Sequence, residues 1–204
     1  MKGQGRGLAV IFLALVLLFA APPRGAQSHP HVWIDTHATL HFEAGKLTAL
    51  DVVWVFDDFF SSMMIEDFAA RGGKDFTPEG HGELERQVML PMAEFGFFTH
   101  VTADGSALKI EKIDGFKARI EDGRVVFAFR ALLPRPVDPR VTALSVGLYD
   151  ESYYVELLLD EWDPFRLAGE AVPSCAIDMT EDMSRPLYFG AFFPRVATLR
   201  CTGS

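Results

Sequence analysis

Several common catalytic and binding motifs are missing from this chain of 204 residues. It has no Gly-x-Ser-x-Gly nucleophile elbow, no phosphate-binding loop, no dinucleotide fingerprint and no His-Glu-x-x-His zinc motif. Adjacent acids occur at 66–67 and 160–161, but neighbouring side chains point in different directions on a helix or a strand. We therefore expect no enzyme, with one copper-dependent exception considered below.

Basic residues are also scarce. The chain has 19 Lys and Arg against 28 Asp and Glu, for a formal net charge of −9. Nucleic acids and anionic membranes both require a basic surface, so neither is an expected partner, whereas cations are compatible with this charge. With 49% hydrophobic and 12% aromatic residues, the chain has the composition of a folded protein and not of a disordered one.

Only one long apolar run occurs, between Leu8 and Ala21. It follows Lys2 and Arg6 and precedes the small-residue pattern Ala26-Gln27-Ser28, which is typical of a signal peptide cleaved after Ser28. An uncleaved membrane anchor fits less well, since the run falls short of the ~20 residues that a spanning helix needs. Residues 1–28 are therefore the expected signal peptide. We expect residues 29–204 to form one periplasmic domain that is not inserted in the membrane after cleavage. Without Lys2, Arg6 and Arg24, its formal charge would be −12.

Cysteine is limited to Cys175 and Cys201. Their spacing fits no common zinc motif. Because an exported protein lies in an oxidising compartment, the sequence predicts a disulfide between them, stabilising the fold by roughly 3 kcal/mol in the chain-entropy model.

Histidine, in contrast, is concentrated at the start of the expected mature chain. Four of the six histidines lie between His29 and His41, all at odd positions. Side chains alternate between the two faces of a β-strand, so a strand here would bury the even positions and gather the odd ones on the opposite face. That face would carry His29, His31, Trp33, Asp35, His37, Thr39 and His41.

The remaining patterns predict an α+β domain that is mostly antiparallel sheet, sandwich-like, with a two-helix insertion after the first hairpin. The first strand and an apolar strand over 47–56 form that hairpin, with glycine in the turn. Two amphipathic helices follow, the second bent or ended by Pro91. Asp-Gly turns then predict an antiparallel meander from 97 to 133, prolines at 134–139 a stiff connector, and 141–149 with 153–159 a further strand pair. A last strand is expected near 197–201.

Four short motifs resemble a bacterial family of unknown function, domain of unknown function 1007. They are His29-Pro30-His31-Val32-Trp33-Ile34-Asp35, Trp54-Val55-Phe56-Asp57-Asp58, Phe97-Phe98-Thr99-His100 and Tyr149-Asp150-Glu151-Ser152-Tyr153-Tyr154. That family is catalogued as the periplasmic component of an uncharacterised ABC-type transport system. Its members tend to be encoded beside permeases of the nickel/cobalt exporter type. The resemblance thus implies periplasmic handling of a transition metal, with such a permease as partner.

The residues themselves indicate a site for a divalent transition metal, zinc, nickel or cobalt, with copper possible. Imidazoles two residues apart on one strand face can share an ion, and cleavage after Ser28 would add the α-amine of His29. Pro30 lacks an amide hydrogen, which excludes the usual square-planar backbone site and leaves side-chain ligation. Further ligands must come from elements that fold back onto this strand. The predicted set is His29, His31, Asp57, Asp58, His100 and Asp150.

Plainer roles compete with several of these assignments. Asp58 is equally suited to capping the helix that begins near Phe59, Asp150 to an ordinary turn, and His81 to a solvated helix surface. His37 and His41 are too far along the strand to share an ion with His29 and His31, and are either a weaker second site or surface histidines.

Three functions follow from the sequence. The leading one is a periplasmic accessory protein that binds a divalent transition metal for a membrane transporter. A copper-binding redox protein with an N-terminal histidine brace is the enzymatic alternative. The third is a partner of a permease that binds no metal and exposes aromatic residues around 59–60 and 97–98.

Overall fold

The computed structural model describes residues 31–202. It opens with a long antiparallel hairpin of β1 (Val32–Glu43) and β2 (Lys46–Phe56). Ala44 and Gly45, both with positive φ, make the two-residue turn that such hairpins favour. All even positions of β1 are buried, whereas the odd positions are exposed or half-buried. The predicted two-faced strand is confirmed.

The first sheet is built around this hairpin and is mixed. Its order is β5–β6–β2–β1–β8, with β5 at Lys112–Glu121, β6 at Arg124–Val137 and β8 at Val155–Leu159. A further short strand, β9 (Phe165–Gly169), also pairs with β1. Both β8 and β9 run parallel to β1, β8 beside residues 32–36 and β9 beside residues 38–42. The start of β1 therefore has β2 on one side and β8 on the other.

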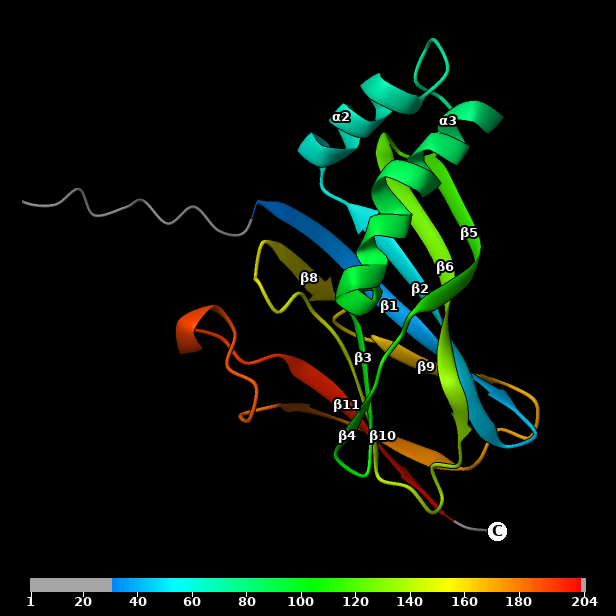
Figure 1. Cartoon of the computed structure of the whole chain (residues 1–204), viewed down its shortest axis with the longest axis vertical. Helices are drawn as coiled ribbons and strands as arrows, with labels where there is room; N and C mark the ends of the chain where they lie inside the picture. The colour runs from blue at the N-terminus through cyan, green and yellow to red at the C-terminus, as the bar shows by residue number, and fades with distance from the viewer. Residues whose placement is uncertain (1–30, 203–204) are drawn as a thin grey trace, which may run out of the picture.

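The second sheet is antiparallel and lies lower in Figure 1, with the order β10–β11–β7–β3–β4. Its strands are β3 (Thr99–Ala103), β4 (Ser106–Leu108), β7 (Leu144–Leu148), β10 (Cys175–Glu181) and β11 (Arg195–Cys201). Buried side chains of the two sheets, such as Trp54 and Phe127 from the first and Val101 and Val146 from the second, belong to one continuous core.

Helices are inserted between β2 and β3. The first, α2 (Asp58–Phe68), is docked by the buried Ser61, whose Oγ accepts a hydrogen bond from the backbone N–H of Val125 at 2.9 Å. The second begins as α3 (Pro78–Leu84) and continues through a π-helical turn, η1 (Glu85–Met89), into η2 (Leu90–Phe98). A short 3₁₀ turn, η3 (Tyr188–Gly190), lies between β10 and β11.

The fold class and the two-helix insertion after the first hairpin are confirmed. The predicted meander is wrong, because β3 and β4 belong to the second sheet and β5 and β6 to the first. Asp104-Gly105 and Asp122-Gly123 do form tight turns with positive φ. Asp114-Gly115 instead lies inside β5, where the register with β6 shifts. A turn signal at this position is therefore a bulge.

Three further details differ from the predictions. The strands β7 and β8 do not pair but lie in different sheets, so the turn after β7 carries the chain from one layer to the other. The β6 strand runs through Pro134 and Pro136, which fall between the pairs Ala49↔Leu132 and Leu47↔Val137, where the ladder is irregular. Of the two effects expected at Pro91, the ending of the helix is wrong: the helix changes from π-helical to 3₁₀ form beside Pro91 and continues until Gly96 and Phe97 adopt positive φ.

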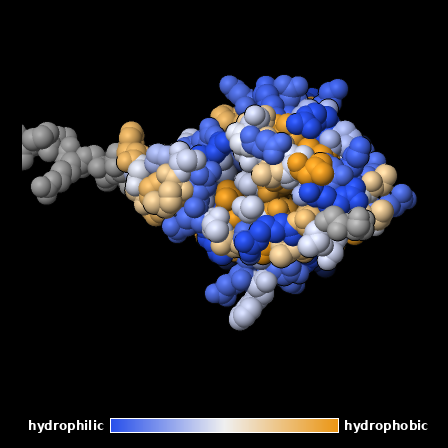
Figure 2. Space-filling view, turned by 90° about the horizontal axis from the view of Figure 1, so that it is seen from below, coloured by the Kyte–Doolittle hydropathy of each residue, from blue (hydrophilic) through white to orange (hydrophobic). Residues whose placement is uncertain are grey.

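The predicted disulfide is present between Cys175 and Cys201, which are paired neighbours on β10 and β11. Among the described residues no helix is long and apolar enough to cross a membrane. Viewed from the end where the last strand lies, the surface is a mosaic in which apolar residues lie between hydrophilic ones (Figure 2).

Candidate functional site

His31 is the residue directly before β1, and its side chain is exposed. Its backbone N–H donates to the carbonyl oxygen of Tyr154 at 2.9 Å, and the two rings lie 4.7 Å apart between centroids. His29, the other member of the predicted terminal pair, lies outside the described residues. The strand geometry therefore presents one imidazole of the pair, next to the entry of β8.

Asp57 and Asp58 lie close to this end of β1, but in different roles from those expected. Asp57 is the N-cap of α2: its Oδ1 accepts from the N–H of Phe60 at 2.8 Å and its Oδ2 from the N–H of Trp33 at 3.0 Å. Asp58 is the first helical residue, is not the cap, and has a side chain that is 95% exposed. Asp57 thus fixes the helix to β1, and the exposed Asp58 carboxylate pairs with Arg124 at 3.8 Å.

His37 and His41 have different neighbours along the same face. Burial lowers the pKa of His37 and the nearby Arg166 lowers it further, whereas Asp160 and Asp163 oppose the shift. His41 lies 3.9 Å from Asp51 and 4.0 Å from Glu43. A second site shared by His37 and His41 stays a prediction. Each has its own acidic surroundings.

His100 has the most restrained imidazole geometry. It lies on β3 with its side chain on the face turned away from the core, because Thr99, Val101 and Ala103 point inwards. Its Nε2 is 2.9 Å from the carbonyl oxygen of Tyr149, and its ring is stacked on the Tyr149 ring at 3.8 Å with only 8° between planes. Burial lowers the pKa of His100, against the raising effects of the Tyr149 carbonyl and Glu151.

Gly147 explains how a tyrosine ring can cover this histidine. It is the residue paired with His100 across β3 and β7. A Cβ atom at this position would come within 2.8 Å of the Tyr149 ring and 3.0 Å of Val196. The missing side chain makes room for the ring of Tyr149, which packs with Leu187 and Val196 in a small cluster separate from the main core.

Asp150 is buried, with 5% of its surface exposed. Its carboxylate accepts hydrogen bonds from the N–H and Oγ–H of Ser152 and from the N–H groups of Tyr154 and Val155, at 2.7 to 3.0 Å. These donors fix the turn that carries the chain from the second sheet to β8. These contacts fit the alternative role expected for Asp150, that of a turn residue.

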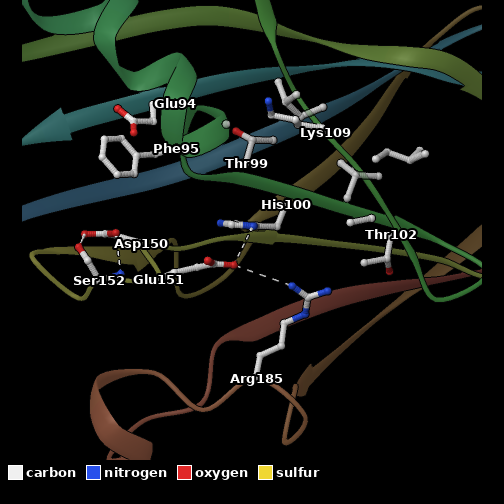
Figure 3. A pocket seen from close by; sticks show the side chains of 15 residues that line it. Glu94, Phe95, Thr99, His100, Thr102, Lys109, Asp150, Glu151, Ser152 and Arg185 are labelled. Atoms are coloured by element: carbon white, nitrogen blue, oxygen red, sulfur yellow. Dashed lines mark hydrogen bonds and ion pairs between the residues drawn. The ribbon is translucent and has the colours of Figure 1, made fainter.

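A cavity of about 510 Å³ opens beside His100 (Figure 3). Glu151 Oε1 lies 4.0 Å from His100 Nδ1 and 4.0 Å from an Nη atom of Arg185, so the carboxylate stands between the two side chains. Arg185 also pairs with Asp182 at 3.3 Å. Phe95, Leu108 and Ile110 contribute apolar wall, and Asp150 lies on the same cavity.

The predicted ligands are thus divided between two places. His31, Asp57 and Asp58 lie at the start of β1 and α2, while His100 and Asp150 line the cavity. Within residues 31–202, no group of three or more His, Cys, Asp or Glu side chains is placed to hold a metal ion. Glu151 and Arg185 were missed by the sequence reasoning. Glu151 lies within one of the quoted motifs, but nothing in the sequence marked Arg185.

Two other sequence expectations are wrong. His81 is not a solvated helix residue: it is half-buried against β5, and its Nε2 accepts a hydrogen bond from the N–H of Ala118 at 3.1 Å. The aromatic patch expected around 59–60 and 97–98 exists only at Phe59, which is 73% exposed, because Phe97 and Phe98 are buried in the core.

Comparison with known proteins adds a family but no activity. Residues 14–186 match the family described as "Protein of unknown function (DUF1007)". The chain is also 24% identical over 134 residues to an "Uncharacterized 15.5 kDa protein in trpE 3'region" of Spirochaeta aurantia, covering 66% of this chain and 95% of that protein.

Proposed function

The chain belongs to the DUF1007 family of proteins of unknown function, and we propose that it is a periplasmic accessory protein that binds a divalent transition metal, zinc, nickel or cobalt, for a membrane transporter. The proposal assigns the primary site to the imidazoles of His29 and His31 with the α-amine released by cleavage after Ser28. A nickel/cobalt-type permease is the partner proposed on the family resemblance.

One observation carries the proposal. His31 directly precedes β1, and its side chain is exposed, so its imidazole is accessible to an ion. Neutral imidazole is a good ligand for zinc, nickel, cobalt and copper. Asp58 is exposed at the start of α2, next to Asp57, which is hydrogen-bonded to the start of β1; we propose its carboxylate as an oxygen ligand. The Asp57 carboxylate already accepts two backbone hydrogen bonds.

Calorimetric titration of the mature protein with Zn²⁺, Ni²⁺ and Co²⁺ tests this function. We expect binding at micromolar affinity or better by the native N-terminus, and weaker binding by a protein with one additional leading residue, because the extra residue moves the α-amine away. His31→Ala should lower the affinity by about tenfold or more, the scale of losing one metal ligand's free energy.

His41→Ala is the matched control, since His41 lies on the same face of the same strand but has Asp51 and Glu43 as its neighbours. Equal affinity of the native, extended and His31→Ala proteins would contradict the proposed site. Redox cycling by the copper-loaded protein would instead favour the histidine-brace alternative.

A further inference from the structure

Two hydrogen-bond acceptors face each other in the cavity beside β3. A carbonyl oxygen can only accept, so the contact with Tyr149 places the hydrogen of His100 on Nε2 and leaves the Nδ1 lone pair of the neutral ring available. That Nδ1 lies 4.0 Å from Glu151 Oε1, an atom that can also only accept when ionised. The same Oε1 atom also lies 4.0 Å from the Arg185 guanidinium, which leaves the space between Nδ1 and Oε1 for a cation or a double donor.

The surroundings of His100 are those of a metal ligand. Metal-binding imidazoles commonly donate their second ring N–H to a backbone carbonyl or a carboxylate, which fixes the tautomer and the ring orientation. Here the Tyr149 carbonyl accepts that hydrogen, and the stacked Tyr149 ring, accommodated by Gly147, holds the plane of the imidazole. Glu151 is 67% exposed, so its carboxylate can approach an ion held at about 2 Å from Nδ1.

These two ligands are too few for a protein-only site. Zinc sites take four ligands, and no third His, Cys, Asp or Glu in residues 31–202 joins a metal-holding group. The cavity, at about 510 Å³, has the volume of a small-molecule site. It can therefore accept an ion together with the molecule that fills the other coordination positions.

The walls indicate what that molecule is. Phe95, Leu108 and Ile110 provide apolar contact. Two cationic side chains also line the cavity: Lys109, which pairs with Glu111, and Arg185, which pairs with Asp182 and is directed toward Glu151 in Figure 3. A hydrated metal ion alone would gain no favourable contact from apolar or cationic side chains. A chelator with an apolar part and a carboxylate would contact both.

We propose that this cavity binds a divalent transition metal as its complex with a small carboxylate-bearing chelator, with His100 Nδ1 and Glu151 as the two protein ligands and Arg185 as the partner of the chelator's carboxylate. This rests on the proposed function and adds to it the form in which the metal is carried. The site is separate from the terminal pair, and the two can be tested independently.

The test uses the full mature chain with His31→Ala, which disables the terminal pair. Calorimetry compares Ni²⁺ alone, Ni²⁺ with one equivalent of L-histidine, and Ni²⁺ with one equivalent of citrate. We expect one of the two complexes to bind with 1:1 stoichiometry and about tenfold or more tighter than Ni²⁺ alone. The better complex shows which kind of chelator the walls prefer.

Glu151→Gln and His100→Gln in this background should each weaken binding of the better complex by about tenfold, the effect of removing one ligand. Glu151 is mostly exposed, so its substitution leaves the fold intact even if His100→Gln disturbs the stack. Glu121→Gln, an exposed acid paired with Arg119 on β5, is the matched control and should bind like the parent.

Two results would overturn the inference. One is that neither complex binds better than Ni²⁺ alone; the other is unchanged binding in Glu151→Gln, the result expected if a water molecule bridges the two acceptors. The proposed function stands after either result if the protein without the His31→Ala change still binds metal at its native N-terminus. Loss of terminal binding with the cavity still occupied by the complex would contradict the terminal site alone.

Discussion

Histidines on the outer faces of the two sheets differ in how far other side chains cover them. Along β1 the outer face is lined by ion pairs, such as Asp35 with Arg124 and the neighbouring Asp51 with Arg130, and His31 is open to solvent. On the second sheet His100 lies under a tyrosine ring, held by a segment that supplies Leu187 and Arg185 from the connection between β10 and β11. An open face presents a ligand freely. The covered face fixes the orientation of the His100 ring and the nitrogen that carries its hydrogen.

The largest change in stability should come from removing the disulfide between Cys175 and Cys201, which joins β10 to β11 in the second sheet. Replacing both cysteines by serine should lower the free energy of unfolding by about 3 kcal/mol, because the unfolded chain regains the entropy of the closed loop. Chemical denaturation of the double variant against wild type measures it. A loss of less than 1 kcal/mol would show that the β10–β11 pair does not depend on the disulfide.

Gly147→Ala should have the next largest effect. It should lower the free energy of unfolding by about 2 kcal/mol, within the usual range for overpacking. The new methyl group would displace the Tyr149 ring and expose His100. Thermal unfolding gives the stability change, and the His100 NMR titration should move up toward the ordinary histidine value. Ser145→Ala, two residues earlier on the same strand, is the control and should change neither.

A smaller effect is expected from pH. Burial lowers the pKa of His100 in the folded protein, so the unfolded chain binds a proton first as the pH falls. The contribution to stability is full above the unfolded value of about 6.5 and is lost as the pH drops below it. In chelator-treated protein, the NMR titration midpoint of His100 should lie below that value, and His37 should behave likewise.

Comparison of unfolding free energies at pH 7.5 and 5.5 completes this test. His100→Gln should show a weaker dependence on pH than wild type. A midpoint for His100 at or above 6.5 in the folded protein would mean that the cover over the second sheet is open in solution.

The smallest change in stability is expected on the outer face of the first sheet. Asp51→Asn removes the Asp51–Arg130 pair, in which the side chains are 40% and 38% exposed, and should lower the free energy of unfolding by only about 0.5 kcal/mol. Added salt should reduce even this difference. A loss comparable to that of Gly147→Ala would remove the distinction between an open and a covered face.

Strictly local features were predictable from the sequence. Alternation predicted the two faces of β1, and Ala44-Gly45 and two of the Asp-Gly pairs predicted the tight turns. The even number of cysteines and the expected export predicted the disulfide. Sheet membership was not predictable, because a turn such as 150–154 can either pair its two strands or carry the chain between layers. The same ambiguity made Asp114-Gly115 look like a turn when it is a bulge in β5.

The candidate site divides in the same way. The sequence by itself determined that histidines gather on one face of the first strand, because period-two alternation is a property of any strand. Only the tertiary structure decided that His100 meets Glu151 and Arg185 beneath Tyr149, because these residues come from β3, the turn before β8 and the β10–β11 connection. Long-range pairing of strands, and the missing side chain at Gly147, bring them together.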